Sequence, residues 1–236
     1  MIVSFCFTIN LMDSMDNLDI YQTMITKAIT FANKYHKVNF YTDTETLSYL
    51  SINDVDIKLI DTSNFYFIDD FKIHLLSIIS EDEVLIDTDL FLFDKLKLET
   101  GHDIYVDFKD SSKNKWYTEY LNWCVNTGIR EIVPEFGKLK IHPPNIGILK
   151  ITNKELKSEY IELYNSVRQW ILIKDKNINK GISIILGQYL LGIILQHRYK
   201  IYYFCGKHKY IHLGGPQKFN KDILEQYLPD NKSKLI

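Results

Sequence analysis

The stretch EDEVLIDTDLFLF, residues 81–93, joins two apolar runs through a pair of aspartates. The aliphatic run at residues 84–86 predicts a buried strand. Asp87 and Asp89 follow it on either side of one threonine, and the apolar run resumes at once with Leu90. Ionised carboxylates are costly to bury, and two so close together repel each other. The stretch therefore predicts a strand that ends at a charge needing neutralisation.

Upstream of these aspartates, short apolar runs alternate with segments of helical periodicity. Residues 18–35 have apolar side chains spaced for one helix face, and residues 68–80 repeat that pattern directly before the aspartate strand. Alternation of this kind is typical of a sheet whose strands are joined by helical crossovers. The predicted strands of this half cover residues 2–9, 38–41, 57–60 and 84–86.

The downstream half is less regular but continues the same pattern. Further strands are predicted at residues 103–109, 145–151 and 200–206, and helices at residues 154–170 and 181–197. The chain contains neither an internal repeat nor a low-complexity linker. We therefore predict an α/β fold with a central mixed, mostly parallel sheet flanked by helices. It would form one domain over residues 1–228, followed by a polar tail over residues 229–236.

Composition limits the classes of function. With 236 residues, of which 46% are hydrophobic, the chain can form a sizeable core. A net charge of -2 gives no general attraction to nucleic acid or to an anionic membrane surface. The three cysteines are far apart, which favours reduced thiols. The first residues lack signal-peptide features and no apolar run reaches about 20 residues, so we expect a cytoplasmic protein without a membrane span.

The position of the two aspartates favours metal binding. In open α/β sheets, ligands bind beyond the carboxyl ends of the strands, which is where Asp87 and Asp89 lie. Because side chains alternate along a strand, both acids would point to one side and Thr88 to the other. Two carboxylates on one side suit a hard cation, Mn²⁺ or Mg²⁺. Alternatively, the acids simply end a strand and face water, but the apolar residues on both sides argue against this.

A different chemistry also uses two aspartates after a strand. In phosphatases of the haloacid dehalogenase type, the first acid is a nucleophile and the second a proton donor. That scheme needs a downstream lysine and a further acidic pair at a later strand end. The sequence offers no convincing acidic pair after residue 110. We therefore rank a phosphatase using Asp87 and Asp89 second.

Three segments occur in an order that resembles a known family. They are Asp87-Thr88-Asp89, PNIGIL at residues 144–149, and HLGGPQKFN at residues 212–220. They are similar to the DxD motif, the F-N-S-G-V strand and the H-x-x-G-x-x-K-P-W element of GT-A glycosyltransferases. The resemblance is to the retaining family that includes glycogenin and bacterial lipopolysaccharide galactosyltransferases. The last element keeps its His, Gly and Lys spacing, but Phe-Asn replaces the usual Pro-Trp.

The resemblance implies a set of site residues. Asp87, Asp89 and His212 would hold Mn²⁺, or Mg²⁺, against the diphosphate of a nucleotide-sugar. Gln188 would lie under the sugar and Lys218 would neutralise charge on the leaving group, so both would be catalytic. At Gly187, beside that glutamine, the family carries an acid. Contacts with the donor are implied for Thr8, Asn10, Lys72, Asp87, Thr88, Asn145, Gly147, Gly214, Gly215 and Lys218.

Together these features predict a metal-dependent glycosyltransferase that moves a sugar from a UDP-sugar to a glycan or protein acceptor. The resemblance implies retention of configuration. Inversion would need a carboxylate base, for which Asp107, Glu131 and Glu135 are the candidates. A third possibility is a non-catalytic module of the same fold that binds nucleotide-sugars or glycans, favoured by the missing acid at position 187. The oligomeric state, the sugar and the acceptor are not predicted.

Overall fold

The computed structural model describes residues 1–12, 15–110, 115–137, 141–175, 182–183, 185–196, 198–213 and 222. Two compact units make up the chain. The first consists of residues 1–62, 84–97 and 208–236, and the second of residues 63–83 and 98–207. Each unit is therefore assembled from segments that are distant in the sequence.

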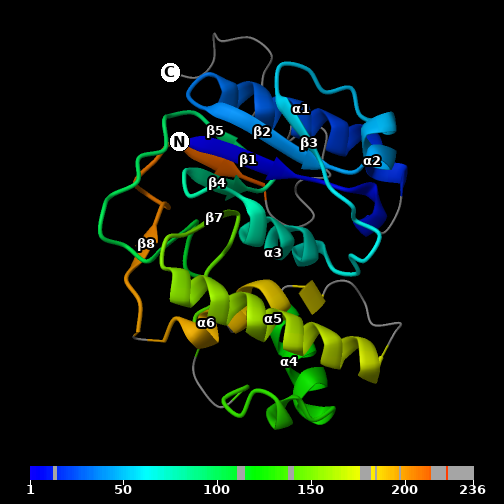
Figure 1. Cartoon of the computed structure of the whole chain (residues 1–236), viewed down its shortest axis with the longest axis vertical. Coiled ribbons are helices and arrows are strands. Elements are labelled where there is room, and N and C mark those ends of the chain that lie inside the picture. The colour runs from blue at the N-terminus through cyan, green and yellow to red at the C-terminus, as the bar shows by residue number, and fades with distance from the viewer. Residues whose placement is uncertain are drawn as a thin grey trace. The chain divides into compact units, whose positions relative to one another are not determined.

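Strands of the first unit lie in the order β3-β2-β1-β4, and β1 pairs with β2, and β2 with β3, in parallel. Helix α1 connects β1 to β2 and runs alongside these strands (Figure 1). It buries one face, with Met24, Ala28 and Ala32 fully covered, as its apolar spacing predicts. The elements are β1 (Ile2–Cys6), α1 (Leu18–Asn33), β2 (Lys37–Thr42), α2 (Thr44–Tyr49), β3 (Asp56–Leu59) and β4 (Glu83–Ile86).

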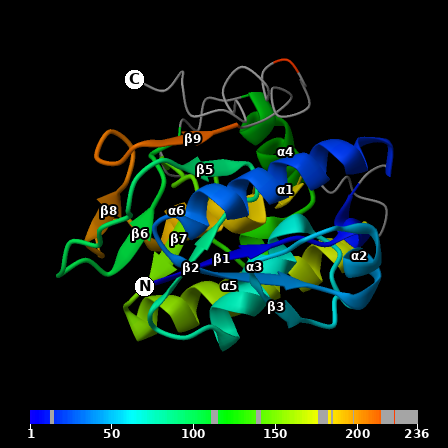
Figure 2. The same ribbon diagram turned by 90° about the horizontal axis from the view of Figure 1, so that it is seen from above.

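A separate two-stranded sheet completes the first unit. Strand β5 (Leu90–Leu92) pairs antiparallel with β9 (Tyr210–His212), and α1 packs against β5 (Figure 2). The rings of Phe31 and Phe93 contribute to that packing, with their centroids 4.9 Å apart. The sequence does not predict β9, because a run of three residues is too short to show a strand periodicity; in the structure all three are half-buried. This short pairing matters because it carries His212.

Three sheet strands of the second unit lie in the order β7-β6-β8. Strand β6 pairs antiparallel with β7 and parallel with β8, so this sheet is mixed. Its helix α3 leads directly into β4, in the order that the sequence predicts. The elements are α3 (Ile68–Ile78), β6 (Ile104–Val106), α4 (Lys115–Asn126), β7 (Ile148–Ile151), α5 (Lys154–Lys174), a π-helix (Ile185–Tyr189), α6 (Leu190–Ile194) and β8 (Ile201–Tyr203).

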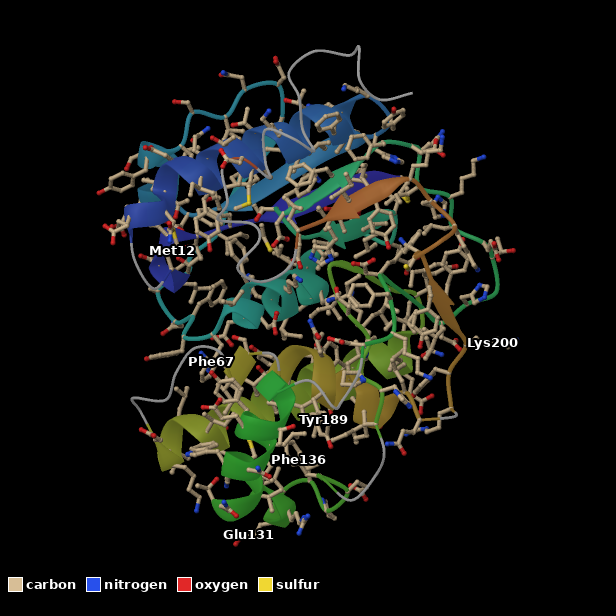
Figure 3. The ribbon with its side chains drawn as sticks, turned by 180° about the vertical axis from the view of Figure 1, so that it is seen from behind. Met12, Phe67, Glu131, Phe136, Tyr189 and Lys200 are labelled. Carbon is tan, nitrogen blue, oxygen red and sulfur yellow. The ribbon has the colours of Figure 1, made fainter. Side chains whose placement is uncertain are left out.

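Aromatic side chains fill much of the second unit's core. Helix α5 buries Tyr160 and Tyr164, and Trp170 near its end contacts Trp123 of α4 with ring centroids 5.9 Å apart. Figure 3 shows Phe136 and Tyr189 next to each other, and their centroids are 5.0 Å apart. Two of the three tryptophans thus pack against each other, as expected for core residues.

The structure confirms the predicted α/β class with a mixed, mostly parallel sheet and flanking helices. One local prediction needs correction. Residues 181–197 were expected to form one α-helix, but their described part contains the π-helix Ile185–Tyr189 followed by α6. Within the residues described, no helix combines the length and the apolar character needed to cross a bilayer.

Candidate metal centre

The aspartate motif lies in a turn between two buried strands of the first unit. All residues of β4 and β5 are buried, and the Leu90 N–H donates to the Asp87 carbonyl oxygen at 3.1 Å. The strand therefore ends at Ile86, one residue before the first acid, as predicted. The two carboxylates were predicted to share one side because side chains alternate along a strand. That reason was wrong, because residues 87–89 are not part of a strand. The turn, and not strand pleating, brings both carboxylates together.

The third member of the centre comes from β9. His212 pairs with Leu90, the first residue of β5, and the Leu213 N–H donates to the Asp89 carbonyl oxygen at 2.9 Å. These backbone contacts fix the register of β9 against the turn. As a result, an imidazole that is distant in the sequence is held beside the two acids.

Asp87, Asp89 and His212 each offer a ligand atom, and these atoms lie within 4.8 Å of one another. His212 Nε2 is 3.4 Å from Asp89 Oδ1 and 3.9 Å from Asp87 Oδ2. The Asp89 and His212 side chains are 11% and 13% exposed, whereas Asp87 is 30% exposed. The centre is thus covered on one side and open to a ligand at Asp87. We call these three residues the acid–imidazole triad.

The donor set of the triad fits a divalent cation. Two carboxylates in partly buried positions repel each other, and a cation between them removes that repulsion. Carboxylate oxygens suit Mg²⁺ and Mn²⁺, and a neutral imidazole is a common nitrogen ligand of transition metals. An oxygen, oxygen, nitrogen set of this kind is therefore suited to a divalent cation. The reading of Asp87 and Asp89 as solvent-facing strand ends does not fit the burial of Asp89.

Other predicted donor contacts of the first unit have structural partners. Thr8 is 4% exposed, and its hydroxyl accepts a hydrogen bond from the Asn10 N–H at 3.2 Å, which caps a short 3-10 helix, Ile9–Leu11. The Asn10 amide donates to Thr62 Oγ1 at 3.2 Å, although Asn10 itself is exposed. Thr88 is half-buried in the aspartate turn. These positions remain predictions for donor binding.

In the second unit, the structure brings three predicted residues together. Lys72 of α3 is 6% exposed, and its Nζ donates to the Ile146 carbonyl oxygen at 3.0 Å. In the same loop the Asn145 side-chain oxygen accepts from the Gly147 N–H at 2.8 Å. Lys72 is therefore buried and fixed against the Asn145–Gly147 loop, and it is not a solvated lysine at the polar edge of a helix.

Gln188 is half-buried in the π-helix, a rare geometry that is common at functional sites. Of the three candidate bases for inversion, Asp107 is fully buried, whereas Glu131 and Glu135 are exposed; Glu131 points outwards in Figure 3. Only these two glutamates are therefore accessible to an acceptor. Gly214, Gly215 and Lys218 lie outside the described residues, as does the predicted tail.

Sequence reasoning missed two buried acids at the start of α3, Asp69 and Asp70, which are 7% and 4% exposed. Asp70 accepts hydrogen bonds from Arg168 Nε and the Tyr164 hydroxyl, both at 2.7 Å, and from the Tyr66 and Phe67 N–H groups. In the sequence alone, two acids at the start of a predicted helix indicate no more than its N-terminus. Tyr164 and Arg168, which contact Asp70, are 94 and 98 residues away in α5, so no pattern of sequence spacing could have paired them with it.

Comparisons with known proteins identify similar folds. Neither a family model nor a curated protein matches the chain. Among solved structures, the glycosyltransferase GlyE of Streptococcus pneumoniae TIGR4 is 18% identical over 86% of this chain, with a TM-score of 0.46. An active-site mutant of LgtC is 14% identical over 86% of this chain and 72% of its own, with a TM-score of 0.45. Mouse xyloside xylosyltransferase 1 is 12% identical over 73% of this chain and 74% of its own, with a TM-score of 0.41.

This chain covers only 45% of the length of GlyE. The identities and TM-scores are low for all three structures.

Proposed function

We propose that this chain is a metal-dependent glycosyltransferase that moves a sugar from a UDP-sugar to a glycan or protein acceptor with retention of configuration. The observation that carries this proposal is the acid–imidazole triad. The sequence motifs resemble a family in which these three residue types hold a cation, and the proposal is supported by their ligand atoms, which lie within 4.8 Å of one another. The position of His212 depends on the pairing of β9 with β5, in which His212 lies opposite Leu90. A specific strand pairing therefore holds the imidazole beside the two aspartates.

The roles of the triad residues follow from their exposure. Asp89 and His212 are mostly covered, so they are held in fixed orientations, whereas the more exposed Asp87 can also contact the nucleotide. His212 must be neutral to act as a ligand, so donor binding should weaken as the imidazole becomes protonated. A bound divalent cation would supply Lewis-acid stabilisation to the departing diphosphate.

Retention can proceed without a protein base. The bond between the sugar and the diphosphate breaks, the acceptor oxygen forms a bond on the same face, and the acceptor proton passes to the departing phosphate oxygen. This route is compatible with full burial of Asp107. Lys218, which we propose to neutralise the leaving group, and Gly214 and Gly215, which would let backbone approach it, complete the donor contacts.

Calorimetric titration of UDP in the presence of Mn²⁺ tests the metal centre. Asp87→Asn and Asp89→Asn should weaken UDP binding at least about tenfold, because each removes an anionic ligand. Asp94→Asn is the matched control: it changes an exposed aspartate of the same segment, whose side chain accepts from the neighbouring Lys95 N–H at 2.7 Å. Unchanged affinity in the two triad variants, with wild-type melting curves, would remove the assignment.

Turnover separates the enzyme from the alternatives. A transferase should slowly release UDP from one donor in a panel of UDP-sugars when Mn²⁺ is present, and His212→Ala should abolish this release. Binding without release on every donor and acceptor would favour the non-catalytic module. Mg²⁺-dependent hydrolysis of p-nitrophenyl phosphate that is lost in Asp87→Asn would favour the phosphatase.

A further inference from the structure

Gly187 has no room for a side chain. A Cβ atom at this position would overlap Asp69 Oδ2, would lie 2.6 Å from Asp69 Cγ, and would lie 3.1 Å from Ile146 Cδ1. Real Cβ atoms essentially never make contacts as close as the two with Asp69, and the contact with Ile146 is tight. A side chain at position 187 would therefore displace the Asp69 carboxylate, which occupies that space. Position 187 lacks an acid in the sequence, but an acid from α3 occupies its place in the fold.

Burying the Asp69 carboxylate in this position is energetically unfavourable. It is 7% exposed, and it lies near the buried Tyr160 and Tyr164. Burial raises the pKa of both hydroxyls; the negative charge of Asp69 raises that of Tyr160 further, and the charges of Asp70 and then Asp69 raise that of Tyr164. The Tyr160 hydroxyl donates to the Gly187 carbonyl oxygen at 2.6 Å, so this tyrosine fixes the glycine in place. An ionised group in such surroundings is unfavourable unless its partners compensate for the loss of water.

The ordinary explanation for an acid at this position is helix capping, because a carboxylate in the first turn interacts favourably with the helix dipole. In α3, however, Asp70 performs that role. Its Oδ2 accepts from the N–H groups of Tyr66 and Phe67 at 2.6 and 3.0 Å. The side chain of Asp69 instead points at the π-helix. Both acids lie in the first turn of α3, but Asp70 caps the helix, whereas the Asp69 carboxylate lies against Gly187.

The residues around Asp69 form one polar cluster inside the second unit. Gln188 follows Gly187 in the π-helix and is half-buried. Lys72 follows Asp69 by one helical turn, and its Nζ is bound to the carbonyl oxygen of Ile146, whose side chain faces the same Gly187 position. The Asp69 carboxylate thus lies at Gly187, next in the chain to the amide-bearing Gln188, and the Lys72 ammonium group is held on the neighbouring Ile146. We call Asp69, Lys72, Ile146, Gly187 and Gln188 the Asp69 cluster.

We infer that Asp69 supplies the carboxylate of the sugar-binding site, delivered from α3 in place of a side chain at position 187, and that it binds sugar hydroxyl groups together with Gln188. The inference rests on the proposed function. A carboxylate accepts hydrogen bonds from hydroxyl donors, and an amide both donates and accepts, so the pair can recognise adjacent hydroxyls. The site would therefore select a donor sugar whose hydroxyls are free. If Asp69 supplies the carboxylate, the absence of an acid at position 187 no longer favours a non-catalytic module.

The experiment moves the carboxylate from one element to the other. Asp69→Ala removes it, Gly187→Asp introduces a second one into occupied space, and the double variant Asp69→Ala/Gly187→Asp restores a single carboxylate. Gly187→Asp alone should lower Tm by about 5 °C or more because of the overlap, and Asp69→Ala should recover most of that loss. Failure of the double variant to melt above Gly187→Asp would overturn the exchange.

Function is read by two measurements on the same proteins. Asp69→Ala should reduce kcat/KM for UDP release from the preferred donor at least about tenfold, while the affinity for UDP with Mn²⁺ stays within about twofold of wild type. The double variant should regain most of the lost kcat/KM. Asp69→Asn keeps the size but loses the charge, so it should behave like Asp69→Ala, and it replaces that variant if the latter does not fold.

The outcomes separate the two proposals. Equal kcat/KM in Asp69→Ala and wild type, or an equal loss of UDP affinity and turnover, would overturn the role of Asp69 and leave the metal-dependent transferase intact. In contrast, absence of Mn²⁺-dependent UDP binding by the wild type would overturn the proposed function itself, and the sugar site with it.

Discussion

Two covered carboxylates, one in each unit, are surrounded in opposite ways. The Asp70 side chain, 3% exposed, has an arginine 2.7 Å away, a tyrosine hydroxyl and two backbone N–H groups. The Asp89 side chain, 11% exposed, has a second carboxylate beside it and the titratable imidazole of His212 at 3.4 Å. The permanent charge of Arg168 neutralises Asp70 within the protein. At Asp89, a cation from solution could still neutralise the negative charge. This difference in neutralisation separates an acid with a structural role from an acid suited to binding a cation.

The largest expected effect is on folding stability at Asp70. Asp70→Asn leaves the mostly covered Arg168 without its counter-charge, and removing one partner of such a pair costs about 3–5 kcal/mol. Asp89→Asn instead relieves repulsion within the triad and should change the free energy of unfolding by less than about 1 kcal/mol without metal. Urea denaturation of both variants measures the difference. Equal destabilisation by the two substitutions would erase the distinction between the acids.

Metal should reverse the ranking of the two acids. Mn²⁺ at a concentration 100-fold above its Kd should raise the free energy of unfolding of the wild type by about 2.7 kcal/mol. The same gain is expected in Asp70→Asn, whose triad is intact, but not in Asp89→Asn. Thermal melts with and without Mn²⁺ provide the measurement. A gain that persists in Asp89→Asn would place the binding site elsewhere.

Two histidines of the first unit allow a similar contrast. His36 is 8% exposed, and its Nε2 accepts a hydrogen bond from the Leu96 N–H at 3.0 Å, so the imidazole is neutral. Burial, and then the positive charges of the N-terminus and Lys95, lower the pKa of His36 to about 4. His212, in contrast, faces two carboxylates.

The pH dependence of stability follows from His36. The unfolded chain binds a proton at this residue near pH 6.5 and the folded chain only near pH 4. This stability is therefore fully present above pH 6.5 and falls by about 2–3 kcal/mol as the pH drops to about 4. Urea titrations between those pH values measure the slope. His36→Gln keeps an acceptor for Leu96 and should flatten it; an unchanged slope would mean that other groups control the acid sensitivity.

The smallest effect is expected at Asp43, which has no part in either acid centre. Burial raises the pKa of Asp43, but hydrogen bonds from Thr46 and Thr8 outweigh burial and leave the pKa below its usual value. Its carboxylate caps α2 by accepting from the Thr46 N–H at 2.8 Å. Asp43→Ala should cost about 1 kcal/mol, and Asp43→Asn much less, in urea denaturation. Equal costs would show that the charge, and not the cap, is important.

Local patterns predicted most elements of the fold because their residues carry their own signals. The apolar spacing of α1 and the aliphatic run of β4 are examples, and both begin within one residue of the predicted position. Position 187 shows where such reasoning fails. A glycine in the sequence indicates a missing acid, and only the course of α3 shows that Asp69 fills the space. Likewise, Lys72 has the spacing of a solvated lysine, but its burial depends on the distant Asn145–Gly147 loop.

The attachment of His212 to a three-residue strand has a consequence for how this centre can change. Because side chains alternate across a pleat, a shift of β9 by one residue against β5 would turn the imidazole to the opposite face and bring Ile211 or Leu213 into its place. Deleting or inserting a single residue in the connection before β9 could therefore disable the centre while every ligand remained in the sequence. The affinity of the centre for a cation should therefore depend on the register of β9 against β5.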